Sequence, residues 1–170
     1  MSYDLFVFDP SAAPRDRAAF LAWFNEQVGD SECYFVGSSE GLRAWHNVML
    51  PKWPDMQEVD DDQADDPHVT GYSCTPQSIY IDFRWSVAEE AYEATRRNAV
   101  ECKVGFYDVS GDDGDGEIYF PGDELRDPSA GGWRRVAEDF RSGDMSKYIP
   151  EHFLQDAKPK RRWFDFFRRK

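Results

Sequence analysis

The stretch VSGDDGDGEIYF, residues 109–120, places four acidic side chains and three glycines between two β-rich runs, a composition that could bind a metal ion. A calcium loop of the EF-hand type has oxygen ligands at positions 1, 3 and 5, glycine at 6 and glutamate at 12. In a loop starting at Asp108, Asp113 would occupy the glycine position and Tyr119 the glutamate position. Glycine and aspartate also supply the positive φ angles of hairpin loops. We therefore expect a hairpin turn with an acidic tip and no metal.

Residues suited to nucleophilic or acid–base catalysis are scattered along the chain. They are His46, His68, His152, Cys33, Cys74 and Cys102. The histidines lack HExxH or HxH spacing, the cysteines form no CxxC pair, and GxSxG, P-loop and GxGxxG motifs are absent from the sequence. Cys102 with a distant histidine could form a dyad, but its sequence context does not support one. We expect no enzymatic activity and no cofactor; a small enzyme with an unrecognised site is an alternative.

Charge is the strongest signal in the composition. The 170 residues carry a formal net charge of −13. The segment 158–170 holds seven bases and one acid, so the preceding 157 residues, with 13 bases and 32 acids, carry −19. Such an acidic body repels nucleic acid and anionic membranes and attracts a basic protein partner. A surface that is acidic for solubility alone is the alternative.

Several features bear on location. No apolar run approaches the roughly 20 residues of a spanning helix, and the start, MSYDLFVFDP, has no basic region or cleavage site of a signal peptide. Three widely spaced cysteines, an odd number, favour a reduced chain. We expect a cytoplasmic protein.

The N-terminal half contains one predicted strand and two predicted helices. Residues 3–8 form a short apolar run, residues 14–27 carry apolar side chains at helical spacing, and residues 39–50 form a second helix before Pro51. His46, beside Trp45 in that helix, is expected to be packed or half-exposed. The next segment, 57–68, is acidic and poor in apolar residues, which predicts an exposed loop.

The C-terminal half continues with strands at 68–75 and 78–85, the second alternating apolar and polar residues. A helix should follow, capped by Ser86 and Glu89 in a capping box and running to Glu101. Two strands, 104–110 and 117–121, flank the acidic turn, and a last helix is predicted over 132–141. The residues expected in the core are Phe20, Trp23, Ile81, Phe83 and Tyr92.

The order β-α-α-β-β-α-β-β-α predicts an α+β fold in one domain, residues 1–157, followed by a basic aromatic tail, 158–170. The crossover from Ser78 to Val109 should be right-handed and make its strands parallel, and the other neighbours should be hairpins. We therefore expect a mixed, mostly antiparallel sheet of about five strands with helices on one face. The tail could lie on an anionic membrane, dock in a groove of a partner, or fold back onto the acidic body.

The opening, MSYDLFVFDPSAAPRDRAAFLAWFNEQ, resembles a family of small, mostly uncharacterised bacterial proteins that begin MSYDL.VF.P..AP..R..F..W. The resemblance returns in LRAWHNVMLPKWPDM, in HVTGYSCTPQSIYIDFRWSVAEEAYE and in VGFYDVSGDDGDGEIYFP, and it covers roughly residues 1–121. It implies an immunity-type partner of a secreted toxin. The family has no agreed catalytic residues, so the resemblance transfers no active site.

Charge and resemblance together predict a cytoplasmic protein that neutralises a bacterial toxin by tight binding and occlusion. An adaptor recruited through its tail is the alternative. The expected contact residues lie in two short exposed segments. They are Asp60, Asp61, Asp62, Asp65 and Asp66 in the acidic loop, and Asp112, Asp113 and Asp115 in the turn. Clustered charge is what electrostatic steering requires, because more distant charges are screened beyond about 8–10 Å at physiological salt.

Overall fold

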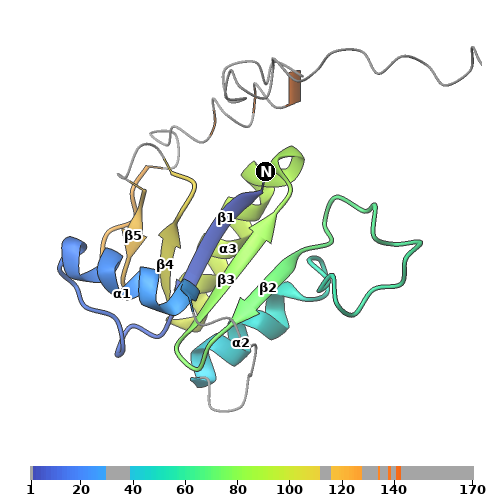
Figure 1. Cartoon of the computed structure of the whole chain (residues 1–170). Coiled ribbons are helices and arrows are strands. Elements are labelled where there is room, and N and C mark those ends of the chain that lie inside the picture. Colours follow the sequence, from blue (N-terminus) through green and yellow to red (C-terminus); the bar gives the residue numbers. More distant parts are fainter. Residues whose placement is uncertain are drawn as a thin grey trace, which may run out of the picture.

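The computed structural model describes residues 2–29, 39–111 and 116–127, together with the helical residues Arg134, Glu138, Arg141 and Ser142. These residues form a five-stranded sheet with helices packed on it (Figure 1). The α+β class and the five strands predicted from the sequence are confirmed. Most of the predicted last helix, 132–141, and the whole tail, 158–170, fall outside the described residues.

The sheet has the order β2-β3-β1-β4-β5, and all of its pairings are antiparallel. The strands are β1 (Tyr3–Phe8), β2 (Gly71–Cys74), β3 (Ser78–Phe83), β4 (Gly105–Asp108) and β5 (Ile118–Tyr119). The pairing of β4 with β5 confirms that the acidic stretch connects the two strands of a hairpin. The tip of that hairpin, 112–115, lies outside the described residues.

The predicted parallel direction of the strands β3 and β4 is confirmed, but the prediction of a mixed sheet is wrong. β3 and β4 point the same way, but β1 lies between them and pairs antiparallel with both. The reason is visible in the burial of β1, which is nearly complete on both faces. A strand that is apolar on both faces is stable at the centre of a sheet, whereas an edge would leave it half-exposed.

Helices cover both faces of the sheet, which corrects the prediction that they cover one. The first face packs on α2 (Glu40–Met49) and α3 (Ala88–Cys102), and this larger core includes Leu5, Trp45 and Ile81. The second face packs on α1 (Arg17–Gly29), in a smaller cluster around Phe6, Phe8 and Phe20. Figure 1 shows α1 on one side of the sheet and α3 on the other. Alternate residues of β1 therefore supply two separate cores.

The core predictions hold with one exception. Phe20, Ile81, Phe83 and Tyr92 are buried, whereas Trp23 is partly buried at the edge of the smaller cluster. Its ring contacts Phe6 and Phe8 edge-on, and the residue stays partly exposed.

The predicted capping box at the start of α3 is wrong. Ser86 lies inside a 3₁₀ turn, η1 (Trp85–Val87), and α3 begins after Val87 without a side-chain cap. Burial of the Trp85 side chain against Tyr3 accounts for the extra turn, because it draws the chain inward before the helix starts. Glu89 instead binds Arg134 and Arg141.

Candidate functional site

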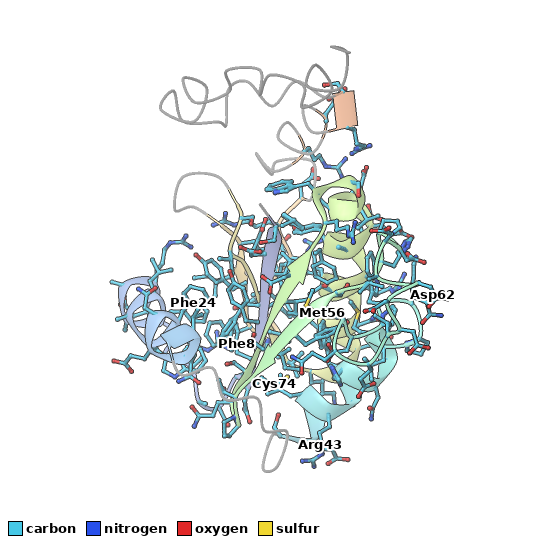
Figure 2. All side chains as sticks on the ribbon, turned by 45° about the vertical axis from the view of Figure 1, so that its right-hand side comes forward. Phe8, Phe24, Arg43, Met56, Asp62 and Cys74 are labelled. Atoms are coloured by element: carbon cyan, nitrogen blue, oxygen red, sulfur yellow. The ribbon has the colours of Figure 1, made fainter. Side chains whose placement is uncertain are left out.

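The acidic loop, residues 55–68, lies between α2 and β2 and projects beside the sheet (Figure 1). Its five predicted contact residues, Asp60, Asp61, Asp62, Asp65 and Asp66, are all exposed. Asp62 lies at the rim of the molecule (Figure 2). The prediction of an exposed acidic loop is therefore confirmed, and the loop places five carboxylates within seven residues.

The loop is a chain of tight turns. Backbone N–H groups donate from Glu58 to the Asp55 carbonyl at 2.9 Å, from Gln63 to the Asp60 carbonyl at 2.9 Å, and from Asp66 to the Gln63 carbonyl at 3.0 Å. Aspartate favours such turns because its short side chain accepts hydrogen bonds from nearby backbone groups. The backbone conformation of the loop is thus set by local hydrogen bonds, and many of its carboxylates remain directed to solvent.

Contacts at both ends and at the middle attach the loop to the body. At its start, the N–H of Met56 donates to the Thr70 carbonyl at 2.9 Å, and the N–H of Thr70 donates to the Pro54 carbonyl at 3.0 Å. In the middle, the Arg84 guanidinium donates to the Ala64 carbonyl at 2.6 Å. Arg84 directly follows β3, so a rigid strand fixes the position of the acidic segment.

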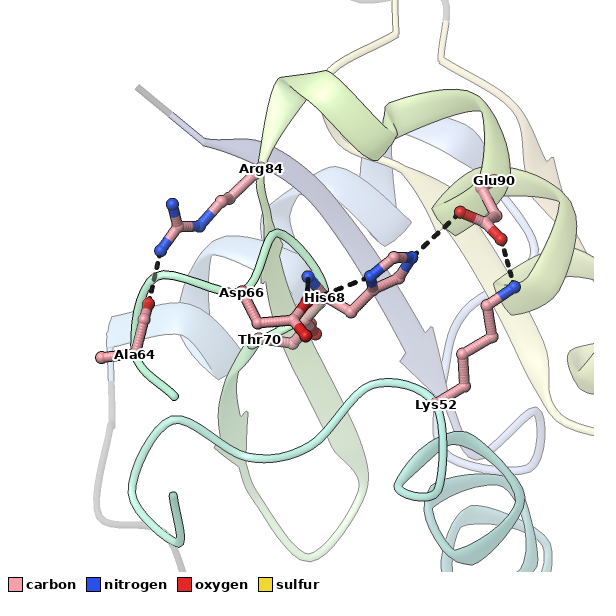
Figure 3. Close-up of polar contacts among 7 residues, drawn as sticks. All are labelled: Lys52, Ala64, Asp66, His68, Thr70, Arg84 and Glu90. Atoms are coloured by element: carbon pink, nitrogen blue, oxygen red, sulfur yellow. Dashed lines mark hydrogen bonds and ion pairs between the residues drawn. The ribbon is translucent and has the colours of Figure 1, made fainter. Parts of the chain in front are cut away.

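The end of the loop is held by a charged cluster around His68 (Figure 3). Its Nδ1 lies 3.1 Å from Asp66 Oδ1, and its Nε2 lies 3.1 Å from Glu90 Oε2 on α3. Lys52 forms an ion pair with the other oxygen of Glu90. The Lys52 and His68 contacts lower the pKa of Glu90, and hydrogen bonds from the backbone and ring of His68 lower the pKa of Asp66.

The eight predicted contact residues therefore differ in their surroundings. Asp60, Asp61, Asp62 and Asp65 stand on the exposed part of the loop, whereas Asp66 is bound to His68. The remaining three, Asp112, Asp113 and Asp115, lie outside the described residues. The structure brings the first five together on one loop.

Two carboxylates at the base of the acidic hairpin are buried, and the sequence analysis did not single them out as a pair. Asp108 is 3% exposed and accepts a hydrogen bond from the Tyr3 hydroxyl at 3.2 Å. Glu117 is 6% exposed; it accepts from the Tyr92 hydroxyl at 2.6 Å and pairs with Arg96 at 3.3 Å. Burial raises the pKa of Asp108 to about 7, with a further contribution from the charge of Glu117 and opposition from the Tyr3 hydrogen bond.

A pattern in the sequence could have revealed Asp108. It lies two residues after Phe106, and alternate residues of a strand share a face, so both side chains point into the larger core. This position also weakens the calcium alternative, because the first ligand of that loop would be the carboxylate that binds Tyr3.

A second pair of carboxylates lies on the opposite face of the sheet. Asp4 and Asp82 are direct neighbours across β1 and β3, and both are partly buried. Burial and the proximity of Asp4 raise the pKa of Asp82 to about 6.

The surroundings of His46, His68 and Cys102 differ from one another. His46 is partly buried with its ring on Tyr72, as the sequence predicts, and burial lowers its pKa. Burial and the adjacent Glu101 raise the pKa of the Cys102 thiol, which disfavours the reactive thiolate. His68 uses both ring nitrogens on carboxylates. His152 and Cys33 lie outside the described residues.

An open groove of about 410 Å³ runs beside α3, where Val100 and Leu125 expose apolar surface between arginine and glutamate side chains. Within the described ranges, no group of three or more histidine, cysteine or acidic side chains could hold a metal ion. None of the helices in those ranges is both long enough and apolar enough to cross a membrane.

Comparison of the chain with models of protein families, with curated proteins and with solved structures found no match.

Proposed function

We propose that this chain is a cytoplasmic, immunity-type protein that neutralises a basic bacterial toxin by binding it tightly and covering its active site. The observation that carries the proposal is the acidic loop, which is exposed and yet held by hydrogen bonds along its length. The resemblance to small bacterial proteins that accompany secreted toxins supports the same class.

The charge of the loop suits a basic partner. Asp60, Asp61, Asp62 and Asp65 lie within six residues. Of the basic groups close to the loop, Arg84 is engaged with the Ala64 carbonyl and Lys52 with Glu90 on the body. Charges packed within a screening length of about 8–10 Å act together on an approaching protein. Such a surface raises the association rate by about 10-fold or more and loses this effect in salt.

The fixed backbone conformation of the loop favours tight binding. A segment that must fold on its partner loses conformational entropy, and this loss weakens the complex. The turns of the loop and the Arg84 contact already fix much of its backbone in the free protein. The partner would therefore meet carboxylates whose positions are largely set.

Met56 is the candidate apolar anchor next to these charges. Its side chain is 56% exposed at the start of the loop, where a methionine can adapt to an irregular partner surface. Buried apolar anchors prolong a complex, whereas surrounding charges mainly speed its formation. The loop acids should therefore affect mainly the association rate constant, and Met56 mainly the dissociation rate constant.

The proposal is tested by capturing the partner from the source cells, purifying it, and measuring association and dissociation at two salt concentrations. The loop variant replaces Asp60, Asp61, Asp62 and Asp65 with asparagine. The control variant has the same loss of charge at four exposed positions elsewhere: Glu26, Glu93, Glu101 and Glu124, each replaced by glutamine. Neither variant should unfold, because single exposed substitutions usually cost under about 0.5 kcal/mol.

We expect the loop variant to associate about 10-fold more slowly at low salt and with a flatter salt dependence, while the control changes little. Met56→Ala should raise the dissociation rate and leave the salt dependence intact. Co-expression of the wild-type chain should also protect cells from the toxicity of the captured partner. Equal rates and equal salt slopes for the loop and control variants would refute the acidic loop as the binding surface.

A further inference from the structure

His68 lies where the acidic loop meets the body, between a carboxylate of the loop and a carboxylate of α3 (Figure 3). The ring is also packed on buried Trp53, with 4.9 Å between the ring centroids. Its backbone is fixed as well, since the N–H of His68 donates to Asp66 Oδ1 at 2.8 Å and its carbonyl accepts from the Thr70 hydroxyl at 2.7 Å. The imidazole is therefore held in one orientation.

The two ring contacts require two donors. Ionised carboxylates only accept hydrogen bonds, and a neutral imidazole carries a single N–H, whereas an imidazolium carries two. Asp66 and Glu90 each face one ring nitrogen at 3.1 Å. The lowered pKa of both acids keeps them ionised in mild acid. Only the protonated ring satisfies both contacts at once.

The groups around the ring define what changes on deprotonation. Asp66 faces the ring from the loop and Glu90 faces it from α3. Lys52, in the turn after α2, pairs with Glu90, and the charge of Arg84, after β3, acts on Asp66. When the ring loses its proton, Lys52 still holds Glu90 on the body, but one carboxylate then faces a ring lone pair. Whichever nitrogen keeps its hydrogen, the ring also loses its positive charge, so the contact with Glu90, which ties the end of the loop to α3, is no longer charge-assisted on both sides and weakens.

We propose that His68 is a proton-operated latch, which fastens the acidic loop to α3 when protonated and loosens it when neutral. Among the side chains of proteins, histidine is the one whose ordinary pKa lies between about pH 5 and 8, which is the general reason that it serves in proton-dependent switches. The idea that the latch regulates partner binding rests on the proposed function. The latch itself is a property of the free protein and does not.

The test measures hydrogen exchange of loop amides in the free, full-length protein at about pH 5.5 and pH 8, with intrinsic rates divided out. The reporting amides are those of Asp66, His68 and Val69, all of which donate hydrogen bonds at the end of the loop. Amides in the middle of α3 serve as the reference for global unfolding. This local comparison is needed because Asp82 and Asp108, with pKa values of about 6 and about 7, alter global stability in the same range.

We expect the opening equilibrium of the loop to rise about two- to fivefold at the higher pH, the range typical of exposed ion pairs. The ratio of the opening equilibrium constant at about pH 8 to that at about pH 5.5 should fall to one in His68→Gln. Glu90→Gln should also reduce it, because an amide can accept from or donate to the ring in either protonation state. Glu93→Gln, with the same change of charge one turn further along α3, should behave like the wild type.

An unchanged ratio in the wild type, or an undiminished ratio in both His68→Gln and Glu90→Gln, would overturn the latch. Either result leaves the proposed function intact, because exchange is measured without a partner. Conversely, suppose that the loop responds to pH while neutralising the loop acids leaves the association rate of the partner unchanged. That pair of results would refute the proposed function and leave the latch intact. If both hold, the association rate of the captured partner should depend on pH in the wild type and not in His68→Gln.

Discussion

Replacing Asp108 with asparagine should stabilise the fold at alkaline pH, because the wild-type carboxyl group must ionise while it is buried. Its pKa rises from 3.8 to about 7 on folding. Between these values the unfolded chain has lost this proton and the folded chain retains it, so stability falls as pH rises and levels off above about 7. At about 1.36 kcal/mol for each unit of pKa, the cost at alkaline pH is at most about 4 kcal/mol.

The expected gain in the free energy of unfolding is smaller than this cost, about 1–3 kcal/mol at pH 8. The reason is that the amide of asparagine replaces one acceptor oxygen with a donor near the backbone of Gly111. Near pH 4 the wild-type group is a neutral acid, and the two proteins should be similar in stability. Urea unfolding of both proteins at several pH values measures the difference, with Asp123→Asn as an exposed control. A constant difference across this range, or a variant that is less stable at pH 8, would refute the reasoning.

Three further predictions concern the core and the hairpin. Phe83→Ala should cost about 3–5 kcal/mol in urea unfolding, because the ring is 1% exposed and packs edge-on against Trp53 at 5.0 Å; a loss under about 1 kcal/mol would contradict the packing. Gly105→Ala should cost about 1–3 kcal/mol by the same measurement, because the added carbon would lie 2.1 Å from the Phe8 ring, and an unaltered midpoint would show that the ring can move. Millimolar calcium should leave the melting temperature unchanged, since a ligand of the folded state would raise it.

The strands and helices follow largely from local patterns in the sequence. Apolar and polar residues alternate along β3, with Ile79, Ile81 and Phe83 buried, and the predicted helices coincide with α1, α2 and α3 to within a few residues. The arrangement of the strands does not follow from such patterns. The insertion of β1 between β3 and β4 depends on pairings between residues about 75 and 100 positions apart, which local periodicity cannot specify.

One part of the candidate site could likewise be predicted from local sequence patterns, and another part could not. The exposed acids of the loop could be predicted, because a segment rich in aspartate and poor in apolar residues has no face to bury. The cluster around His68 could not, since Glu90 lies 22 residues away and Lys52 38 residues from Glu90. Spacing rules for catalytic or metal-binding histidines detect neighbours in the chain, and these contacts form only when α3 packs beside the loop.

The acidic residues of this chain thus fall into a buried group and an exposed group, which the net charge alone does not distinguish. Asp108, Glu117 and Asp82 are wholly or partly buried, so substitutions there change the packing of the sheet as well as its charge. Asp60, Asp61, Asp62 and Asp65 stand on an exposed loop whose turns are made by backbone groups. Because their carboxylates can be neutralised with little effect on folding, these four residues provide the cleanest test of whether the acidic surface binds a partner.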